Sequence, residues 1–246
     1  KKKELIFFDI TKNSIKDLKS NINQNDIFII LSAITNVSWI YNNKKEAYDF
    51  NVTHTIKLIN EISLFQSKII FISSSEVFDG QSGRYNENSS PSPVNYYGKT
   101  KFEVEKYLIS NIDNYCIVRT GWNVDSSNLI RCPVSQTYKT LLHPDTFMAY
   151  DNELSLTFVD DFSDGMCNLI DDHGINLCHI SSSNFITRKD LADYIIKYSK
   201  FGKYLKYKCS KFSKINFLEP KPKKSTLDSS LCIKKYKLSF KKAEDI

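Results

Sequence analysis

The chain has 246 residues, of which 41% are hydrophobic and 25% are charged, proportions typical of a globular protein. Its formal charge is +6, and lysine supplies nearly all of the basic residues. A solvated lysine-rich surface is therefore favoured over a nucleic-acid-binding patch, for which no motif is present. No apolar run reaches about 18 residues, and the N-terminal stretch turns polar too early for a secretory signal, so we expect no membrane span and a cytoplasmic location.

The six cysteines show no CxxC spacing and no histidine spacing suited to zinc. Several of them lie within apolar runs, which predicts buried free thiols. We therefore expect no metal site.

The first half of the sequence alternates apolar runs with helical patterns. The apolar runs predict strands at residues 4–10, 26–31, 68–73 and 115–119. Helical spacing of apolar residues predicts helices at residues 14–21, 44–64 and 97–110. Strands that alternate with helices favour a parallel, doubly wound sheet.

The second half of the sequence is less regular. The pattern predicts a helix at residues 162–170, a strand at residues 176–181 and a helix at residues 191–198. Thr187 and Asp190 have the spacing of a capping box before the last of these helices. Because no linker of low complexity separates the halves, we expect a lobe packed on the sheet rather than an independent domain.

One stretch, residues 68–101, joins the third predicted strand to the helix that begins near Tyr97. Tyr97 and Lys101 are one helical turn apart, so their side chains lie on one face. An ammonium beside a phenol lowers the phenol pKa from about 10, and the tyrosine can then exchange a proton with a substrate oxygen near neutral pH. Ser74, at the end of the strand, could donate a hydrogen bond to that oxygen. Tyr-x-x-x-Lys pairs are also common on helix surfaces, so only the flanking sequence distinguishes a catalytic pair from a surface pair.

Three motifs flank or follow this pair: VFDG at residues 77–80, P-x-N-x-Y-G-x-x-K at residues 93–101 and KPKKSTLD at residues 221–228. Together with Ser74, Tyr97 and Lys101, they resemble the extended short-chain dehydrogenase/reductase superfamily and, within it, the dTDP-4-dehydrorhamnose reductase family. The resemblance covers nearly the whole chain. It implies an α/β fold with a doubly wound, Rossmann-like parallel sheet. Residues 1–135 would form the NAD(P)-binding part, and residues 136–246 mainly a smaller substrate-binding lobe interleaved with the sheet.

The resemblance also assigns roles to single residues. Ser74, Tyr97 and Lys101 would be catalytic, with Tyr97 as the proton donor. NADP or NAD, between which the sequence does not choose, would meet Asp9, Ile10, Ser32, Ala33, Thr35, Ser73, Tyr97 and Lys101. The substrate, a nucleotide-linked keto-sugar, would meet Glu76, Trp122 and Lys221. A core role for Trp122 stays open, and Lys221 stands where the family has arginine.

Two departures from the family pattern leave alternatives open. Ser75 stands where the related dehydratases have an aspartic acid that acts on the leaving hydroxyl, which disfavours dehydration. No glycine-rich turn that would hold a pyrophosphate occurs in the sequence. We expect either a fragment that lacks an N-terminal βαβ part or a chain that has lost this turn, and favour the fragment because every later motif is present in order.

The family resemblance predicts a reductase that takes part in deoxysugar or surface-polysaccharide biosynthesis. Two other functions remain compatible with the motifs: a non-catalytic NAD(P)-binding regulatory subunit and a nucleotide-sugar epimerase of the same fold. We expect no nucleic-acid or membrane partner, and a homodimer is compatible with the sequence.

Overall fold

The computed structural model describes residues 6–18, 22–125, 132–143 and 145–242. Its centre is a four-stranded sheet in the order β1-β2-β3-β7. These strands are β1 Ile27–Ile30, β2 Lys68–Ser74, β3 Tyr115–Thr120 and β7 Leu177–His179. Each neighbouring pair is parallel. The predicted α/β fold with a parallel, Rossmann-like sheet is therefore confirmed.

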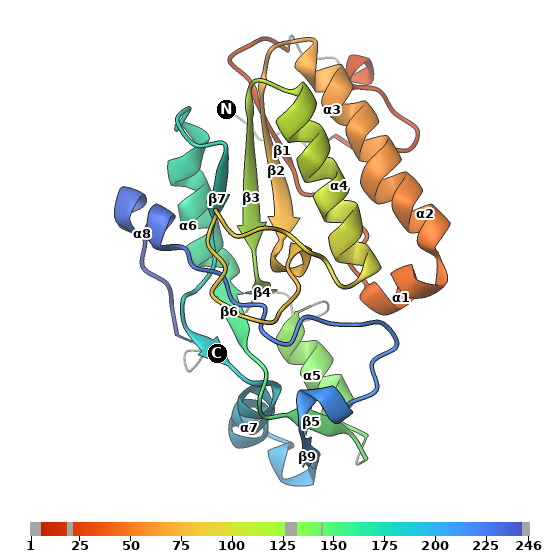
Figure 1. Cartoon of the computed structure of the whole chain (residues 1–246), viewed down its shortest axis with the longest axis vertical. Helices are drawn as coiled ribbons and strands as arrows, with labels where there is room; N and C mark the ends of the chain where they lie inside the picture. Colours follow the sequence, from red (N-terminus) through yellow and green to blue (C-terminus); the bar gives the residue numbers. More distant parts are fainter. Residues whose placement is uncertain (1–5, 19–21, 126–131, 144, 243–246) are drawn as a thin grey trace.

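Helices cover both faces of this sheet (Figure 1). One face carries α2 Lys44–Tyr48, α3 Thr55–Ser63 and α4 Tyr96–Asn111, with α1 Val37–Asn42 at the end of this layer. The other face carries α6 Val159–Ile170 and α8 Ser230–Tyr236. This layering explains why the strands are apolar on both sides rather than alternating with polar residues.

Alternate residues of β2 show the two cores directly. Ile69 and Phe71 belong to the cluster under the α3 and α4 layer, whereas Ile70 and Ile72 belong to the cluster under α6. All four side chains are at most 9% exposed. Each such buried side chain contributes about 1.5–3 kcal/mol through the removal of apolar surface from water.

The helix predicted at residues 44–64 is present but is not uniform. A π-helical segment, Asp49–His54, joins α2 to α3. Such segments widen one turn and often lie beside functional sites. Here the widened turn carries the buried side chain of Asn51 towards the sheet edge.

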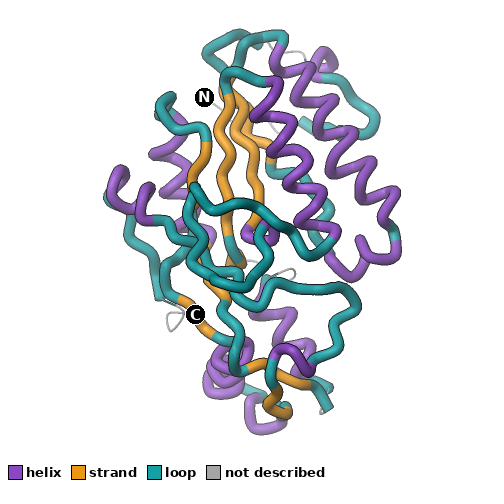
Figure 2. The backbone as a smooth tube through the Cα atoms, viewed as in Figure 1, coloured by secondary structure: helices purple, strands orange, loops and turns teal. Residues whose placement is uncertain are grey.

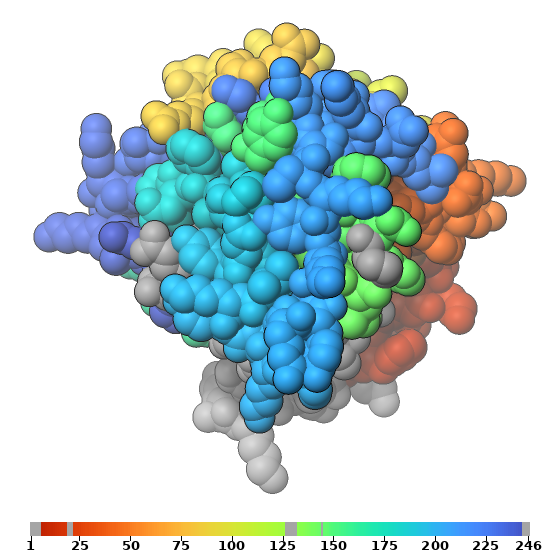
Figure 3. Space-filling view, turned by 90° about the horizontal axis from the view of Figure 1, so that it is seen from below, coloured from red at the N-terminus to blue at the C-terminus, as the bar shows by residue number. Residues whose placement is uncertain are grey.

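The lobe lies beyond the carboxyl ends of the central strands, towards which the arrowheads of β2 and β3 point (Figure 1). It contains a sheet of β4 Trp122–Val124, β6 Leu154–Phe158 and β8 Phe185–Ile186, and a strand pair of β5 Phe147–Ala149 and β9 Lys208–Ser210. Its helices are α5 Pro133–Leu141 and α7 Arg188–Tyr198. Long loops connect these short elements (Figure 2), and the segment that follows α7, in blue, covers much of the lobe end (Figure 3).

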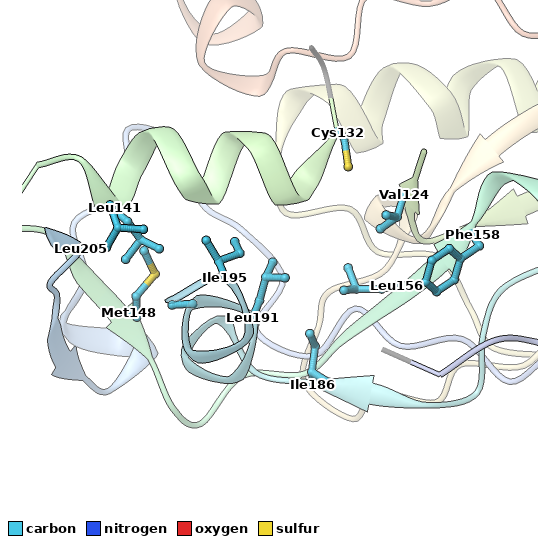
Figure 4. Packing of buried hydrophobic residues seen from close by; sticks show 11 residues of the cluster. Val124, Cys132, Leu141, Met148, Leu156, Phe158, Ile186, Leu191, Ile195 and Leu205 are labelled. Carbon is cyan, nitrogen blue, oxygen red and sulfur yellow. The ribbon is translucent and has the colours of Figure 1, made fainter. Parts of the chain in front are cut away.

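The lobe has an apolar core of its own (Figure 4). Leu191 and Ile195 of α7 face the strands and α5, and they pack with Leu141, Met148 and Leu156. The helix is anchored at its start by the predicted capping box, because the Thr187 hydroxyl accepts from the Asp190 amide and the Asp190 carboxylate accepts from the Thr187 amide. This cap therefore fixes the position of the first residue of α7.

Two predicted elements at the N-terminus are wrong within the described residues. Residues 6–10 are not a strand, because a turn begins at Asp9, whose carbonyl oxygen accepts from the amides of Lys12 and Asn13. The helix predicted at residues 14–21 is a single 3-10 turn, Ile15–Asp17. Residues 1–5 and 19–21 lie outside the described part of the chain.

The division of the chain at residue 135 stays a prediction. β4 lies before this position and belongs to the lobe, whereas β7 lies after it and belongs to the central sheet. No helix in the described ranges is long and apolar enough to cross a membrane. All six cysteines are free thiols; Cys167 and Cys209 are exposed and the other four are buried.

Candidate active site

The end of β2 and the start of α4 meet at the carboxyl edge of the sheet. β2 ends at Ser74 and runs into a 3-10 turn, Ser75–Val77. The Ser74 side chain is half-buried, and its hydroxyl oxygen accepts from the Glu76 amide at 3.2 Å. α4 begins at Tyr96 with Asn95 as its cap, whose side-chain oxygen accepts from the Gly98 amide at 2.8 Å. The first turn of α4 is therefore fixed beside the turn that follows Ser74.

Gly98 permits this close approach. A Cβ atom added at Gly98 would lie 2.0 Å from the carbonyl oxygen of Glu76, closer than any real contact. Only a residue without a side chain lets the helix start pack on this backbone. The glycine of the predicted Y-G-x-x-K motif is therefore explained by packing between α4 and the turn after β2.

Tyr97 lies in this contact and is 9% exposed. Burial raises the pKa of its phenol well above 10, the nearby Glu76 carboxylate raises it further, and a hydrogen bond with the Ser74 side chain lowers it in part. The prediction that Lys101 lowers the Tyr97 pKa is therefore wrong for this structure, because burial raises this pKa and the Lys101 ammonium, which donates to the Ile72 carbonyl, is not among the groups that shift it. The phenol is therefore protonated at neutral pH and is a weaker acid than a free phenol.

Lys101 lies one turn further along α4 and is 4% exposed. Its ammonium donates to the carbonyl oxygen of Ile72 at 2.8 Å and lies 4.6 Å from the ring centroid of Phe71. Burial lowers the pKa of Lys101 to about 8, and the Glu105 carboxylate opposes this shift. The structure thus brings Ser74, Tyr97 and Lys101 to one edge of the sheet; their catalytic roles stay a prediction.

The loop after β1, residues 32–35, lies at the same edge. Asn51 holds it, since its side chain accepts from the Ile34 amide at 2.8 Å and donates to the Ile34 carbonyl at 2.9 Å. Asn51 also donates to the Thr100 hydroxyl at 3.4 Å, and that hydroxyl donates to the Tyr97 carbonyl at 2.7 Å. A buried chain of hydrogen bonds therefore ties this loop to the first turn of α4.

The predicted cofactor residues have different surroundings. Ser32 and Thr35 are exposed and Ala33 is half-buried. Ser73 is 3% exposed, and its hydroxyl has no hydrogen-bond partner among the described residues. Ile10 is 8% exposed, and the Asp9 carboxylate accepts from both the amide and the hydroxyl of Thr11, which lower its pKa.

These residues fit the nicotinamide half of a dinucleotide. The exposed side chains of Ser32 and Thr35 leave the loop open to a ligand, and the Tyr97 phenol and Lys101 ammonium lie at the same edge. Tyr97 and Lys101 would hold the ribose. The contacts of Asp9, Ile10, Ala33 and Ser73 with a cofactor stay predictions.

The predicted substrate residues come together on the lobe side of this edge. Glu76 is half-buried, and its carboxylate accepts from the Asn95 side-chain amide. Burial raises the pKa of Glu76, while Asn95, Lys221 and Arg188 act to lower it. Trp122 lies at the start of β4, and the central guanidinium carbon of Arg188 is 4.8 Å from its ring centroid. Glu76, Trp122 and Lys221 therefore border one region, although contact with a substrate stays a prediction.

Sequence reasoning missed Arg188, Phe217 and Glu219 in this region. The ammonium of Lys221 lies 5.1 Å from the ring centroid of Phe217, and the Glu219 carboxylate accepts from the Tyr96 amide at 2.6 Å. One signal could have found Arg188, because it is one of only four arginines in a lysine-rich chain and directly follows the Thr187 cap. Phe217 and Glu219 carry no such signal in the sequence.

Among the described residues, no group of three or more His, Cys, Asp or Glu side chains is placed to hold a metal ion. The four histidines do not gather at the carboxyl edge. His179 is fully buried at the end of β7, and burial lowers its pKa to about 4.

A parallel Rossmann-like sheet with Ser, Tyr and Lys at its carboxyl edge defines the extended short-chain dehydrogenase/reductase superfamily. Within it, residues 8–244 match the family model described as RmlD substrate binding domain, and the chain belongs to this family. The family predicted from the motifs is therefore confirmed.

Three known proteins illustrate the similarity. Methionine adenosyltransferase 2 subunit beta of Xenopus tropicalis is 39% identical over 69 residues, which are 28% of this chain and 21% of that protein. dTDP-4-dehydrorhamnose reductase of Aggregatibacter actinomycetemcomitans is 33% identical over 98 residues, which are 39% of this chain and 33% of that protein. The structure of dTDP-4-dehydrorhamnose reductase from Bacillus anthracis in complex with NADP has a TM-score of 0.75 at 21% identity and covers 89% of this chain and 77% of that one. The matches span well under two thirds of the two curated relatives.

Proposed function

We propose that the chain reduces a nucleotide-linked keto-sugar with NADPH or NADH, as dTDP-4-dehydrorhamnose reductases do. The observation that carries this proposal is the meeting of Ser74, Tyr97 and Lys101 at the carboxyl edge of the sheet, with Glu76 and the lobe residues beside them. Membership of the family supports it.

The chemistry follows from the protonation states of these residues. When bound, NADPH or NADH would supply the hydride that the carbonyl carbon of the sugar accepts. The half-buried Ser74 hydroxyl donates a hydrogen bond to the carbonyl oxygen, and the Tyr97 phenol, which burial keeps protonated, donates its proton to that oxygen. The Lys101 ammonium, on the same face of α4, would bind the ribose of the cofactor, as the family resemblance implies.

Dehydration fits this site less well. Ser75 is 1% exposed, and its hydroxyl has no partner within the described ranges. A buried hydroxyl does not replace a carboxylic acid as a proton donor. Glu76 alone therefore lacks the second acidic group that removal of water needs.

The test is the oxidation of NADPH and NADH by the full-length protein with a panel of nucleotide 4-keto-sugars. Tyr97→Phe should lower kcat/KM by about 10²–10⁴-fold, the usual contribution of a positioned acid. Tyr107→Phe is the matched control, because Tyr107 lies on the same helix and its hydroxyl donates to Asn60 at the surface. Full activity in Tyr97→Phe would refute the proposal. An epimerase would leave the cofactor unchanged over a cycle.

A second function is supported by the similarity to methionine adenosyltransferase 2 subunit beta. In this case the chain would be a regulatory subunit that binds NADPH or NADH without reducing a sugar. Calorimetric titration with both dinucleotides, run beside the activity panel, separates the two functions. Tight binding with no turnover of any keto-sugar would favour the regulatory subunit.

Three finer points belong to the same proposal. A role in deoxysugar or surface-polysaccharide biosynthesis follows from the proposed substrate class. A cytoplasmic location is supported by six free cysteines, since disulfides are rare in that compartment. A homodimer stays a prediction, which light scattering at several concentrations tests.

A further inference from the structure

The guanidinium of Arg188 lies between two aromatic rings at the start of α7. Its central carbon is 4.8 Å from the ring centroid of Trp122 and 5.7 Å from that of Phe217. The backbone is fixed as well, because the Arg188 amide donates to the Asn152 side chain at 3.0 Å. Arg188 is therefore held in place by packing and by the helix start.

This guanidinium has no dedicated anionic partner. Burial lowers the pKa of Arg188 to about 10, and only the more distant charge of Glu76 opposes the shift. Within the described ranges no carboxylate forms an ion pair with Arg188. Its Nε atom is buried without a hydrogen-bond partner among the described residues. The Arg188 side chain as a whole is half-buried, but a buried donor without an acceptor is costly. A bound anion would supply the missing acceptor.

Lys221 adds a second cation beside the same ring. Its ammonium lies 5.1 Å from the ring centroid of Phe217. Burial lowers the pKa of Lys221, repulsion from Arg188 lowers it further, and Glu76 raises it. The two cations therefore repel each other, and an anion bound between them would reduce this repulsion.

Each neighbouring carboxylate accepts a hydrogen bond from another group, although the second oxygen of Glu219 is buried without a partner among the described residues and the charge of Glu76 acts on both cations. Glu76 accepts from the Asn95 side chain, and Glu219 accepts from the Tyr96 amide at the start of α4. Both carboxylates thus serve the helix that carries Tyr97. The Glu76 charge acts on Tyr97 and also on Arg188 and Lys221. The two cations therefore lie on the same side of the site as the proposed proton donor.

We propose that Arg188 and Lys221, framed by Trp122 and Phe217, form a subsite that binds an anionic oxygen group, a carboxylate or a phosphate, on the ligand. The planar fork of arginine suits two oxygens of either group. The assignment of that anion to a nucleotide sugar rests on the proposed function. The ring face of Trp122 under Arg188 does not stack on a pyranose while the guanidinium occupies it.

Trp122 is a direct probe of this subsite. The chain has two tryptophans, and Trp39→Phe removes the other, which is 40% exposed on α1. In this background the emission of Trp122 is titrated with sodium glucuronate and, separately, with sodium pyrophosphate, at an ionic strength held constant with chloride. We expect saturable quenching or enhancement by at least one of these anions, and no response to chloride alone.

Arg188→Gln should weaken the apparent affinity at least 10-fold, and Lys221→Met should also weaken it. Arg84→Gln is the matched control, because Arg84 is an exposed arginine that also lies over an aromatic ring, that of Phe185 at 5.5 Å. Circular dichroism and thermal melts check that each variant folds. If Arg188→Gln does not fold, Lys221→Met still tests the subsite.

The outcomes separate the two sources of the anion. A response to glucuronate places a sugar carboxylate in the subsite, and a response to pyrophosphate places the diphosphate there. The inference is overturned if neither anion gives a saturable response. It is also overturned if the Arg188 and Lys221 variants bind the anion as tightly as the Trp39→Phe protein from which they are made. These results do not depend on turnover, so a chain that binds the anion but reduces no keto-sugar would keep the subsite and lose the proposed reductase activity.

Discussion

Glu105 and Arg119 form a two-point ion pair buried between α4 and the sheet. The Glu105 carboxylate accepts from the Arg119 guanidinium at 3.0 Å and 2.7 Å, and both side chains are at most 3% exposed. Glu105 lies one turn after Lys101 and opposes the effect of burial on its pKa. The pair therefore connects the face of α4 that carries Tyr97 and Lys101 to the central sheet.

Glu105→Gln should lower the free energy of unfolding by about 3–5 kcal/mol, because it leaves the Arg119 charge buried without its partner. Urea denaturation at pH 7 measures this change. Glu103→Gln is the control, since Glu103 pairs with Lys106 at the surface of the same helix and its loss should cost at most about 1 kcal/mol. Equal losses in the two variants would contradict the structural role of the buried pair.

Gly98→Ala should displace the start of α4 from the turn after β2. The added Cβ would lie 2.0 Å from the Glu76 carbonyl oxygen, and neither backbone can move freely. We expect a loss of about 1–3 kcal/mol in the free energy of unfolding, the usual cost of overpacking, and a fall in the proposed reductase activity as Tyr97 shifts.

Gly174→Ala is the matched control, because Gly174 is exposed and an added Cβ would meet no atom closer than 3.4 Å. Its stability should stay within about 0.5 kcal/mol of wild type. Thermal melts of both variants decide the point. A Gly98→Ala protein as stable and active as Gly174→Ala would show that this close approach is unimportant.

Much of the sheet and the Ser74, Tyr97 and Lys101 edge could be predicted from the sequence, because both follow from local patterns. Apolar runs define β1, β2 and β3, and in a parallel sheet their carboxyl ends meet at one edge. The strand predicted at residues 4–10 failed because an apolar run near a terminus does not reveal the turn that starts at Asp9.

The protonation states and the lobe side of the site could not be predicted in this way. The Tyr97 pKa depends on burial against the turn after β2, which no spacing of residues shows. Arg188 meets Trp122 only because α7 and β4, more than 60 residues apart in the sequence, pack in one lobe. Such contacts are set by tertiary packing rather than by a motif.

Asn51→Ala should loosen the loop after β1. The substitution removes both hydrogen bonds to the Ile34 backbone and leaves these groups without their partner. We expect a loss of about 2–6 kcal/mol in the free energy of unfolding, at roughly 1–3 kcal/mol for each of the two part-buried backbone groups left without a partner, and faster hydrogen exchange at the Ile34 amide. Asn60→Ala, which removes a surface partner of Tyr107, should change neither quantity by a comparable amount. Unchanged hydrogen exchange at the Ile34 amide in Asn51→Ala would show that the Asn51 side chain does not hold the loop after β1.

Lys101 should make stability depend on pH in the alkaline range. Burial lowers its pKa from 10.5 to about 8, so between these values the unfolded chain binds more protons than the folded chain. The contribution of Lys101 to the free energy of unfolding therefore rises with pH from 8 to 10.5, by up to about 3 kcal/mol. Lys101→Met should remove this rise, and the difference between wild type and variant, measured by urea denaturation at half-unit steps of pH, should grow across the window. Lys99→Met, which changes an exposed lysine on the same helix, should give a difference that is flat with pH. A flat difference for Lys101→Met as well would mean that the buried ammonium is not desolvated in the folded protein.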